Sequence, residues 1–194
     1  MPYRFDKVKD KSWNSFKRQK ARYEIIKPFL GEKQVGAEIG VYRGGFGEFL
    51  KRHTRVLYLV DPWYLHAPLW EKGNPESSSV DAFIKILQVY KQEIERGRVI
   101  PVMDYSQSFL KKFDDNFFDW LYLDSSHRYE ETLEEIKLGI SKVKPGGYIL
   151  GDDYSEDPDS KHHAVYRAVT ECCETLGVSL VLNQERQWGV KLPG

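Results

Sequence analysis

The sequence of 194 residues contains few cysteines, no excess of one charge and no long apolar run. Its two cysteines, Cys172 and Cys173, are adjacent, whereas disulfide frameworks and zinc sites need separated pairs. Because 29 lysines and arginines balance 29 aspartates and glutamates, no overall field attracts nucleic acid or an anionic membrane. The N-terminus lacks the apolar run of a signal peptide, and no stretch reaches the roughly 18 apolar residues of a membrane span. These absences predict a protein of the reduced cytoplasm, with no nucleic acid and no membrane among its partners.

Length and pattern together predict one α/β domain covering residues 1–194, since domains contain roughly 100–200 residues. Short apolar runs alternate with segments of helical spacing, which indicates a doubly wound, mostly parallel, seven-stranded sheet with helices on both faces. We expect strands at 34–39, 56–60, 98–102, 118–124 and 148–153, and a C-terminal antiparallel hairpin of 178–183 and 188–192. We expect helices near 12–30, 80–96, 133–140 and 161–176.

The segment 62–79 shows neither a helical nor a strand period. Its aromatic and imidazole side chains make it a candidate substrate lid: Trp63, Tyr64, His66 and Trp70. The alternative is that the same residues only pack the segment onto the sheet.

A glycine-rich loop follows the first expected strand. Glycines let the backbone approach a ligand closely, and here they stand at Gly40, Gly44, Gly45 and Gly47. This is not the GxGxxG spacing of a dinucleotide site, and Glu38 precedes the first glycine by two residues. Asp61, at the end of the second strand, stands where such folds hold ribose hydroxyls. The alternative is that the glycines only tighten the turn and that Asp61 only caps it.

The segments AEIGVYRGGFGEFL and LYLVDPW resemble the first two motifs of class I S-adenosylmethionine-dependent methyltransferases, and the resemblance covers most of the chain. It implies a Rossmann-like fold with S-adenosyl-L-methionine as cofactor. Glu38, Gly40, Tyr42 and Gly44 would then line the methionine end of the cofactor, and Asp61 would accept both ribose hydroxyls. Residues after the third strand, among them Asp104, Tyr105 and Ser106, would hold the adenine. For Asp104 and Ser106 the alternative is a polar turn that starts the next helix.

Three aspartates, Asp124, Asp152 and Asp153, end two strands that we expect to be neighbours. Their carboxylates would repel one another strongly unless a cation lay between them. Hard oxygen ligands select Mg²⁺ or Ca²⁺, which predicts a divalent metal site. The alternative for Asp152 and Asp153 is a solvated acidic loop, because the acids continue through Glu156 to Asp159.

Here the resemblance narrows to the metal-dependent O-methyltransferases of the catechol type, and LYLDSSHRYEE with VKPGGYILGDDY is closer still to the bacterial branch that methylates macrolide sugars. His127 and Asp153 depart from the catechol enzymes, which have lysine and asparagine there. The resemblance implies that a metal on Asp124, Asp152 and Asp153 binds a substrate hydroxyl and that His127 takes its proton. The alternative for His127 is a cap at the start of a helix. We expect His162 and His163 at the surface, where they open the last helix, and the alternative is that they touch substrate or metal.

The resulting hypothesis is an O-methyltransferase that acts on a hydroxyl of a small molecule by direct in-line transfer. Two alternatives stay open: a metal-independent methyltransferase acting on nitrogen or a carboxylate, and a non-catalytic cofactor-binding module. A homodimer is a further expectation, because small members of the family often dimerise. The charge is unevenly distributed, since residues 1–33 hold ten basic and four acidic residues and residues 151–159 hold five acids. We expect the basic residues on the solvated face of an N-terminal amphipathic helical segment within 1–33.

Overall fold

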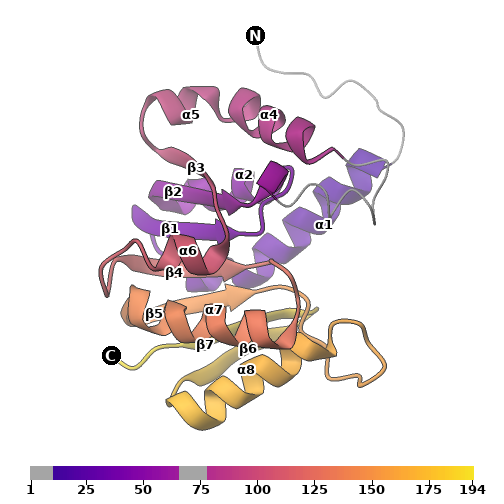
Figure 1. The fold of residues 1–194 in the computed structure, drawn as a ribbon, viewed down its shortest axis with the longest axis vertical. Helices are drawn as coiled ribbons and strands as arrows, with labels where there is room; N and C mark the ends of the chain where they lie inside the picture. The colour runs from indigo at the N-terminus through magenta and orange to yellow at the C-terminus, as the bar shows by residue number, and fades with distance from the viewer. Residues whose placement is uncertain (1–10, 66–77) are drawn as a thin grey trace.

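The computed structural model describes residues 11–65 and 78–194, and these form one sheet of seven strands between two helical layers (Figure 1). The strands lie in the order β3-β2-β1-β4-β5-β7-β6. The first five run parallel, and β7 runs antiparallel to both of its neighbours. The fold class is therefore confirmed. The strands are β1 (Gln34–Ile39), β2 (Thr54–Asp61), β3 (Val99–Met103), β4 (Phe118–Leu123), β5 (Val143–Gly151), β6 (Ser179–Gln184) and β7 (Gln187–Lys191).

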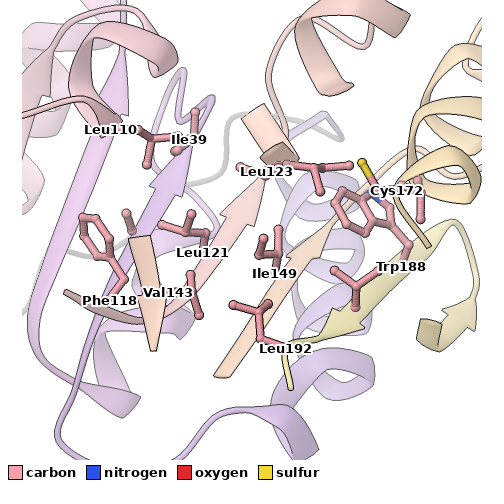
Figure 2. Close-up of a cluster of buried hydrophobic side chains, with 14 of the residues drawn as sticks. Ile39, Leu110, Phe118, Leu121, Leu123, Val143, Ile149, Cys172, Trp188 and Leu192 are labelled. Carbon is pink, nitrogen blue, oxygen red and sulfur yellow. The ribbon is translucent and has the colours of Figure 1, made fainter. Parts of the chain in front are cut away.

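Each face of the sheet has its own apolar core. Helices α6 (Ser106–Leu110), α7 (Tyr129–Lys142) and α8 (His163–Leu176) cover one face, where Cys172 of α8 packs near Trp188 of β7 (Figure 2). Helices α1 (Lys11–Ile26), α2 (Gly47–Leu50), α4 (Ser79–Val89) and α5 (Lys91–Glu95) belong to the other. Both cysteines are free thiols, as the sequence predicted. Short 3₁₀ turns complete the chain: η1 (Lys27–Phe29), η2 (Lys51–His53) and η3 (Trp63–Leu65).

The helix expected at 80–96 consists of two pieces. Ser78 caps the first piece by accepting a hydrogen bond from the Asp81 amide at 3.1 Å. The chain leaves helical geometry at Tyr90, whose buried hydroxyl donates to the carbonyl of Gly44. This hydrogen bond fastens α4 to the glycine loop.

The N-terminal helix differs from the expectation of a solvated basic face. Tyr23 and Ile26 of α1 are buried in the core, and Arg22 is only 6 % exposed. The helix contacts α2 and β7, so its basic side chains reach the carboxyl ends of the strands. Part of the basic excess in residues 1–33 is therefore internal to the domain. Among the described residues no helix is long and apolar enough to cross a bilayer.

The expected lid is described only in part, since His66 and Trp70 lie outside the described residues. Trp63 is 2 % exposed and packs on Phe83 of α4, with 4.8 Å between ring centroids. Its indole nitrogen donates to the carbonyl of Tyr42 at 2.8 Å. Trp63 thus packs the segment onto the domain, whereas Tyr64 is half exposed.

Candidate active site

Two groups of polar residues lie at the carboxyl edge of the sheet. The first, called the glycine-loop side, contains Glu38 and Asp61 with the loop of residues 40–47. The second, called the acidic centre, contains Asp124, Asp152 and Asp153 with His127. Because β1 pairs with both β2 and β4, the two groups are neighbours. Parallel α/β sheets bind their ligands at this edge.

Asp61 joins the loops that follow β1 and β2. Its Oδ2 accepts a hydrogen bond from the amide of Tyr42 at 2.9 Å, and its Oδ1 accepts one from the amide of Trp63 at 2.8 Å. Tyr42 and Trp63 both have positive φ, 48° and 36°, a conformation that non-glycine residues adopt only when the surroundings hold them. The carboxylate is therefore fixed in place by two backbone amides.

Glu38 has a buried oxygen without a partner in the described part of the chain. The residue is 3 % exposed, and its Oε2 accepts no hydrogen bond from any described residue. Burial raises the pKa of Glu38 well above its usual value, although Arg22 acts in the opposite direction. Buried acceptors in proteins are nearly always paired, so this one indicates a missing donor. The ammonium group of a bound S-adenosylmethionine is a donor of suitable charge, and the residues of this side fit that cofactor.

Two glycines of the loop are required by packing. A Cβ atom on Gly40, which has φ 92°, would lie 1.9 Å from the backbone oxygen of Asp124. A Cβ atom on Gly44, with φ 71°, would lie 2.3 Å from the side chain of Ile86. Tightening of the turn is thus a demonstrated role of both residues. Their role in lining the cofactor stays a prediction.

The residues expected near the adenine begin helix α6. Asp104 accepts hydrogen bonds from Ser108 at 3.1 Å, from Lys112 at 2.6 Å and from the amide of Tyr105 at 2.9 Å. Although partial burial opposes it, these donors lower the pKa of Asp104. Tyr105 is half exposed and donates to the carbonyl of Leu65 at 3.4 Å, and Ser106 donates to Gln107 at 3.0 Å. These contacts support the alternative of a polar helix start for Asp104.

The structure brings the three aspartates of the acidic centre together, as predicted, with oxygen atoms within 4.8 Å of one another. It also places an arginine among them. Arg22 Nη2 lies 2.6 Å from Asp124 Oδ2 and 3.2 Å from Asp152 Oδ2. Arg18 Nη2 lies 3.1 Å from the same Asp152 oxygen. The cation between the carboxylates therefore comes from α1.

Arg22 is held firmly in this position. Its guanidinium donates to the hydroxyl of Tyr122 at 2.6 and 3.2 Å and to Gln19 at 3.2 Å. Its Cζ lies 4.7 Å from the centroid of the Phe46 ring. Burial opposes its charge, yet Tyr122, Asp124 and Asp152 together raise the pKa of Arg22. The side chain remains a cation at every pH at which the protein is folded.

Asp153 forms the second half of the acidic centre. Its Oδ2 lies 3.1 Å from Nδ1 of His127 and 3.3 Å from Nδ1 of His162, and Arg186 donates to its Oδ1. His127 and Asp153 have positive φ, 60° and 67°, so both are held in strained conformations. The expectation that His162 lies at the surface is wrong, because its side chain is 13 % exposed and faces Asp153. His163 lies outside this cluster, with Nδ1 3.2 Å from the carbonyl oxygen of Ser155.

Burial shifts the pKa values of His127 and Asp124 in opposite directions. His127 Nε2 lies 3.3 Å from Asp124 Oδ1 and has no hydrogen-bond partner among the described residues. Burial lowers the pKa of His127, although Asp153 and Asp152 act against this. Burial raises the pKa of Asp124 to about 7, with Arg22 opposing and Asp152 adding to the rise. Asp124 can therefore exchange a proton near pH 7, where the imidazole of His127 is neutral.

Sequence reasoning missed four residues of the acidic centre: Arg18, Arg22, Arg186 and Gln187. Gln187 donates to Asp152 Oδ1 and accepts from Tyr122 at 2.7 Å. The uneven charge was the available signal, since residues 1–33 are basic and residues 151–159 are acidic. The charge distribution does not indicate which basic side chains contact the aspartates.

The predicted magnesium ion does not fit the acidic centre as the side chains stand. Every oxygen of the three carboxylates already lies near a nitrogen of arginine, histidine or glutamine. Mg²⁺ binds carboxylate oxygens at about 2.0–2.1 Å and demands near-octahedral geometry. An ion shared by Asp124 and Asp152 would thus compete with the guanidinium of Arg22 for the same Oδ2 atoms.

Comparison with known proteins gives relatives of the same fold. Residues 37–154 match a family model described as "Methyltransferase domain". The solved N-methyltransferase NodS from Bradyrhizobium japonicum WM9 is 16 % identical, covers 93 % of this chain and 98 % of its own, and has a TM-score of 0.65. Its complex with S-adenosyl-L-homocysteine covers 96 % and 94 %, at 16 % identity and a TM-score of 0.62. At this identity the likeness shows the fold alone.

A curated relative is similar in sequence. "Uncharacterized protein R132" of Acanthamoeba polyphaga mimivirus is 26 % identical over 125 residues, which are 61 % of this chain and 51 % of the viral protein. The chain thus spans about half the length of this relative. The family segment 37–154 contains the three aspartates, whereas the three arginines that face them lie outside it.

Proposed function

The chain belongs to the methyltransferase domain family, and from this premise we propose that it methylates a hydroxyl oxygen of a small molecule, with S-adenosylmethionine as methyl donor. The observation that carries the oxygen acceptor is the position of His127 between Asp124 and Asp153. A hydroxyl must lose its proton as it attacks, and a neutral imidazole between two carboxylates can take that proton. When bound, the cofactor supplies a methyl group on a positively charged sulfur, which the acceptor attacks in line.

The glycine-loop side supports the cofactor. Asp61 is held by two amides and can accept the ribose hydroxyls, as the family resemblance implies. Glu38 offers its unpaired oxygen to the ammonium of the methionine end. The NodS complex contains S-adenosyl-L-homocysteine, the demethylated form of the same cofactor. The predictions for Gly40, Tyr42, Gly44, Asp104, Tyr105 and Ser106 as cofactor contacts belong to the same proposal.

His127 and Asp124 carry the proton transfer in this proposal. Burial keeps the imidazole neutral near pH 7, so it is ready to accept a proton. The carboxylates of Asp124 and Asp153 then stabilise the imidazolium that forms. Asp124 shares the proton with His127, because its pKa of about 7 matches this task.

The proposal assigns no step to a metal. The sequence predicted Mg²⁺ or Ca²⁺ on Asp124, Asp152 and Asp153, and Arg22 argues against that arrangement. Of the alternatives drawn from the sequence, metal-independent transfer gains support from this contact. The N-methyltransferase activity named for NodS does not decide the acceptor atom, because the likeness is one of fold.

Calorimetry and turnover assays test the proposal. The full chain is titrated with S-adenosylmethionine and S-adenosyl-L-homocysteine, in EDTA and in Mg²⁺. Product formation is then followed with panels of hydroxyl, amine and carboxylate acceptors. We expect cofactor binding in both buffers and turnover with hydroxyl acceptors. Failure to bind the cofactor would refute the whole proposal, and turnover confined to amines would refute the oxygen acceptor.

A further inference from the structure

We propose that Arg22 is the resident cation of the acidic centre and takes the place of a divalent metal. The part that concerns methyl transfer rests on the proposed function, whereas the part that concerns metal binding does not. Arg22 acts here as a positioning residue, because it touches Asp124 and Asp152 and acts on the reaction through them.

The charges of the acidic centre already balance. Asp124 pairs with Arg22, Asp152 with Arg18, and Asp153 with Arg186. With all three carboxylates ionised and His127 and His162 neutral, the three arginines balance the three negative charges. A Mg²⁺ or Mn²⁺ site depends on net negative oxygen ligands, which this cluster does not offer while the arginines remain.

The position of Arg22 opposes replacement of its guanidinium by a metal ion. One nitrogen, Nη2, contacts the carboxylates at the ends of both β4 and β5, where a bridging ion would bind. The side chain is 6 % exposed and is fixed by Tyr122, Gln19 and the ring of Phe46. Moving it away would leave buried acceptors without donors, which is strongly unfavourable.

The aspartates and Arg22 come from different parts of the chain. The aspartates lie within residues 37–154, the segment that matches the family, while Arg22 comes from α1 outside it. Helix α1 thus brings Arg22 to the aspartates from outside the matched segment. It supplies a guanidinium where the oxygen ligands alone would favour a metal ion.

A consequence for the site is that Arg22 orients the carboxylate of Asp124. Arg22 holds Oδ2, which leaves Oδ1 directed at Nε2 of His127. With a fixed cation in the centre, the acceptor loses its proton to His127 and Asp124, which lie 3.3 Å apart.

Titration of the full chain with Mn²⁺, followed by electron paramagnetic resonance and calorimetry, tests this inference. We expect no saturable site in the wild type up to about 1 mM, the weak end of protein sites for divalent ions. Arg22→Gln should gain one site at least about tenfold tighter, and adding Asp124→Asn should remove it. Arg18→Gln is the matched control, because it removes the same charge from an exposed side chain and should gain no such site.

Saturable Mn²⁺ binding to the wild type that Asp124→Asn abolishes would overturn the inference, even if Arg22→Gln fails to fold. A folded Arg22→Gln variant without a new site would overturn it as well. Binding of S-adenosylmethionine is measured on the same samples. Loss of cofactor binding would count against the proposed function and leave the assignment of Arg22 untouched.

Discussion

The glycine-loop side and the acidic centre lie at the same edge of the sheet but are held together differently. On the glycine-loop side, Asp61 is bound by the amides of Tyr42 and Trp63, which are 19 and 2 residues away in sequence. In the acidic centre, Arg22 reaches Asp124 across 102 residues and Arg18 reaches Asp152 across 134. The first is therefore built from local backbone and the second from distant side chains.

This difference leads to different expectations for the two sides. Backbone amides stay in place when side chains change, so the contacts of Asp61 do not depend on the side chains of Tyr42 and Trp63. Side-chain ion pairs are lost with one substitution, so those of the acidic centre depend on Arg18 and Arg22. Substitutions on the two sides should accordingly change different observables.

The largest effect is expected from His127→Gln. Loss of a general base lowers turnover by about 10²–10⁴-fold, while the affinity for S-adenosylmethionine stays unchanged because His127 belongs to the acidic centre. Steady-state kinetics and calorimetry measure the two quantities. His163→Gln is the control, since His163 lies outside the cluster. An equal loss in both variants would contradict the assignment.

Arg22→Met should destabilise the fold. Removing one partner of a buried ion pair leaves charges uncompensated, and we expect the free energy of unfolding to fall by about 3–5 kcal/mol. Arg18→Met removes a pair whose arginine is 63 % exposed and should cost at most about 1 kcal/mol. Urea denaturation of the two variants gives the difference. Equal losses would contradict the prediction that Arg22 contributes more to stability than Arg18.

The same contrast explains which features of the fold and the site could be predicted from the sequence. The strands and the hairpin follow apolar runs and turn residues, which are local patterns, and the structure confirms them. The meeting of Asp124 with Asp152 and Asp153 follows from strand order, and it was also predicted. Arg22 and His162 were not, because the direction of a basic residue on an amphipathic helix depends on tertiary contacts such as that with Tyr122.

Glu135 of α7 predicts a pH effect on stability. Its carboxylate accepts a hydrogen bond from the Ser125 hydroxyl at 2.6 Å, and burial, opposed by Ser106 and Ser125, raises the pKa of Glu135 from 4.5 to about 7. The pKa of Glu135 is higher in the folded protein than in the unfolded chain. The stability that Glu135 contributes is therefore present below pH 4.5 and is lost as the pH rises to 7.

The free energy of unfolding of Glu135→Gln, relative to that of the wild type, should therefore rise by about 2–3 kcal/mol between pH 5 and pH 8. The other titrating groups are common to both proteins and cancel in this difference. Urea denaturation at the two pH values provides it. A constant difference across this range would contradict the shifted pKa of Glu135.

Asp61→Asn tests the glycine-loop side. Replacing a carboxylate that would accept hydrogen bonds from ribose should weaken S-adenosylmethionine binding by about 10–100-fold, the range for hydrogen bonds to a charged group. The fold should persist, because the carbonyl oxygen of asparagine still accepts one of the two amides. Calorimetry gives the affinity and circular dichroism checks the fold. Unchanged affinity in a folded variant would contradict the predicted role.

The smallest effect is expected from Asp104→Asn, and it decides between two roles for the start of α6. The carboxylate of Asp104 contacts Ser108 and Lys112 of its own helix region, which is what a helix start needs. If that is its whole role, S-adenosylmethionine affinity should change less than about threefold and stability by less than about 1 kcal/mol, as for an exposed pair. A loss of affinity comparable with that of Asp61→Asn would instead place Asp104 at the adenine, and the glycine-loop side would then extend to the end of β3.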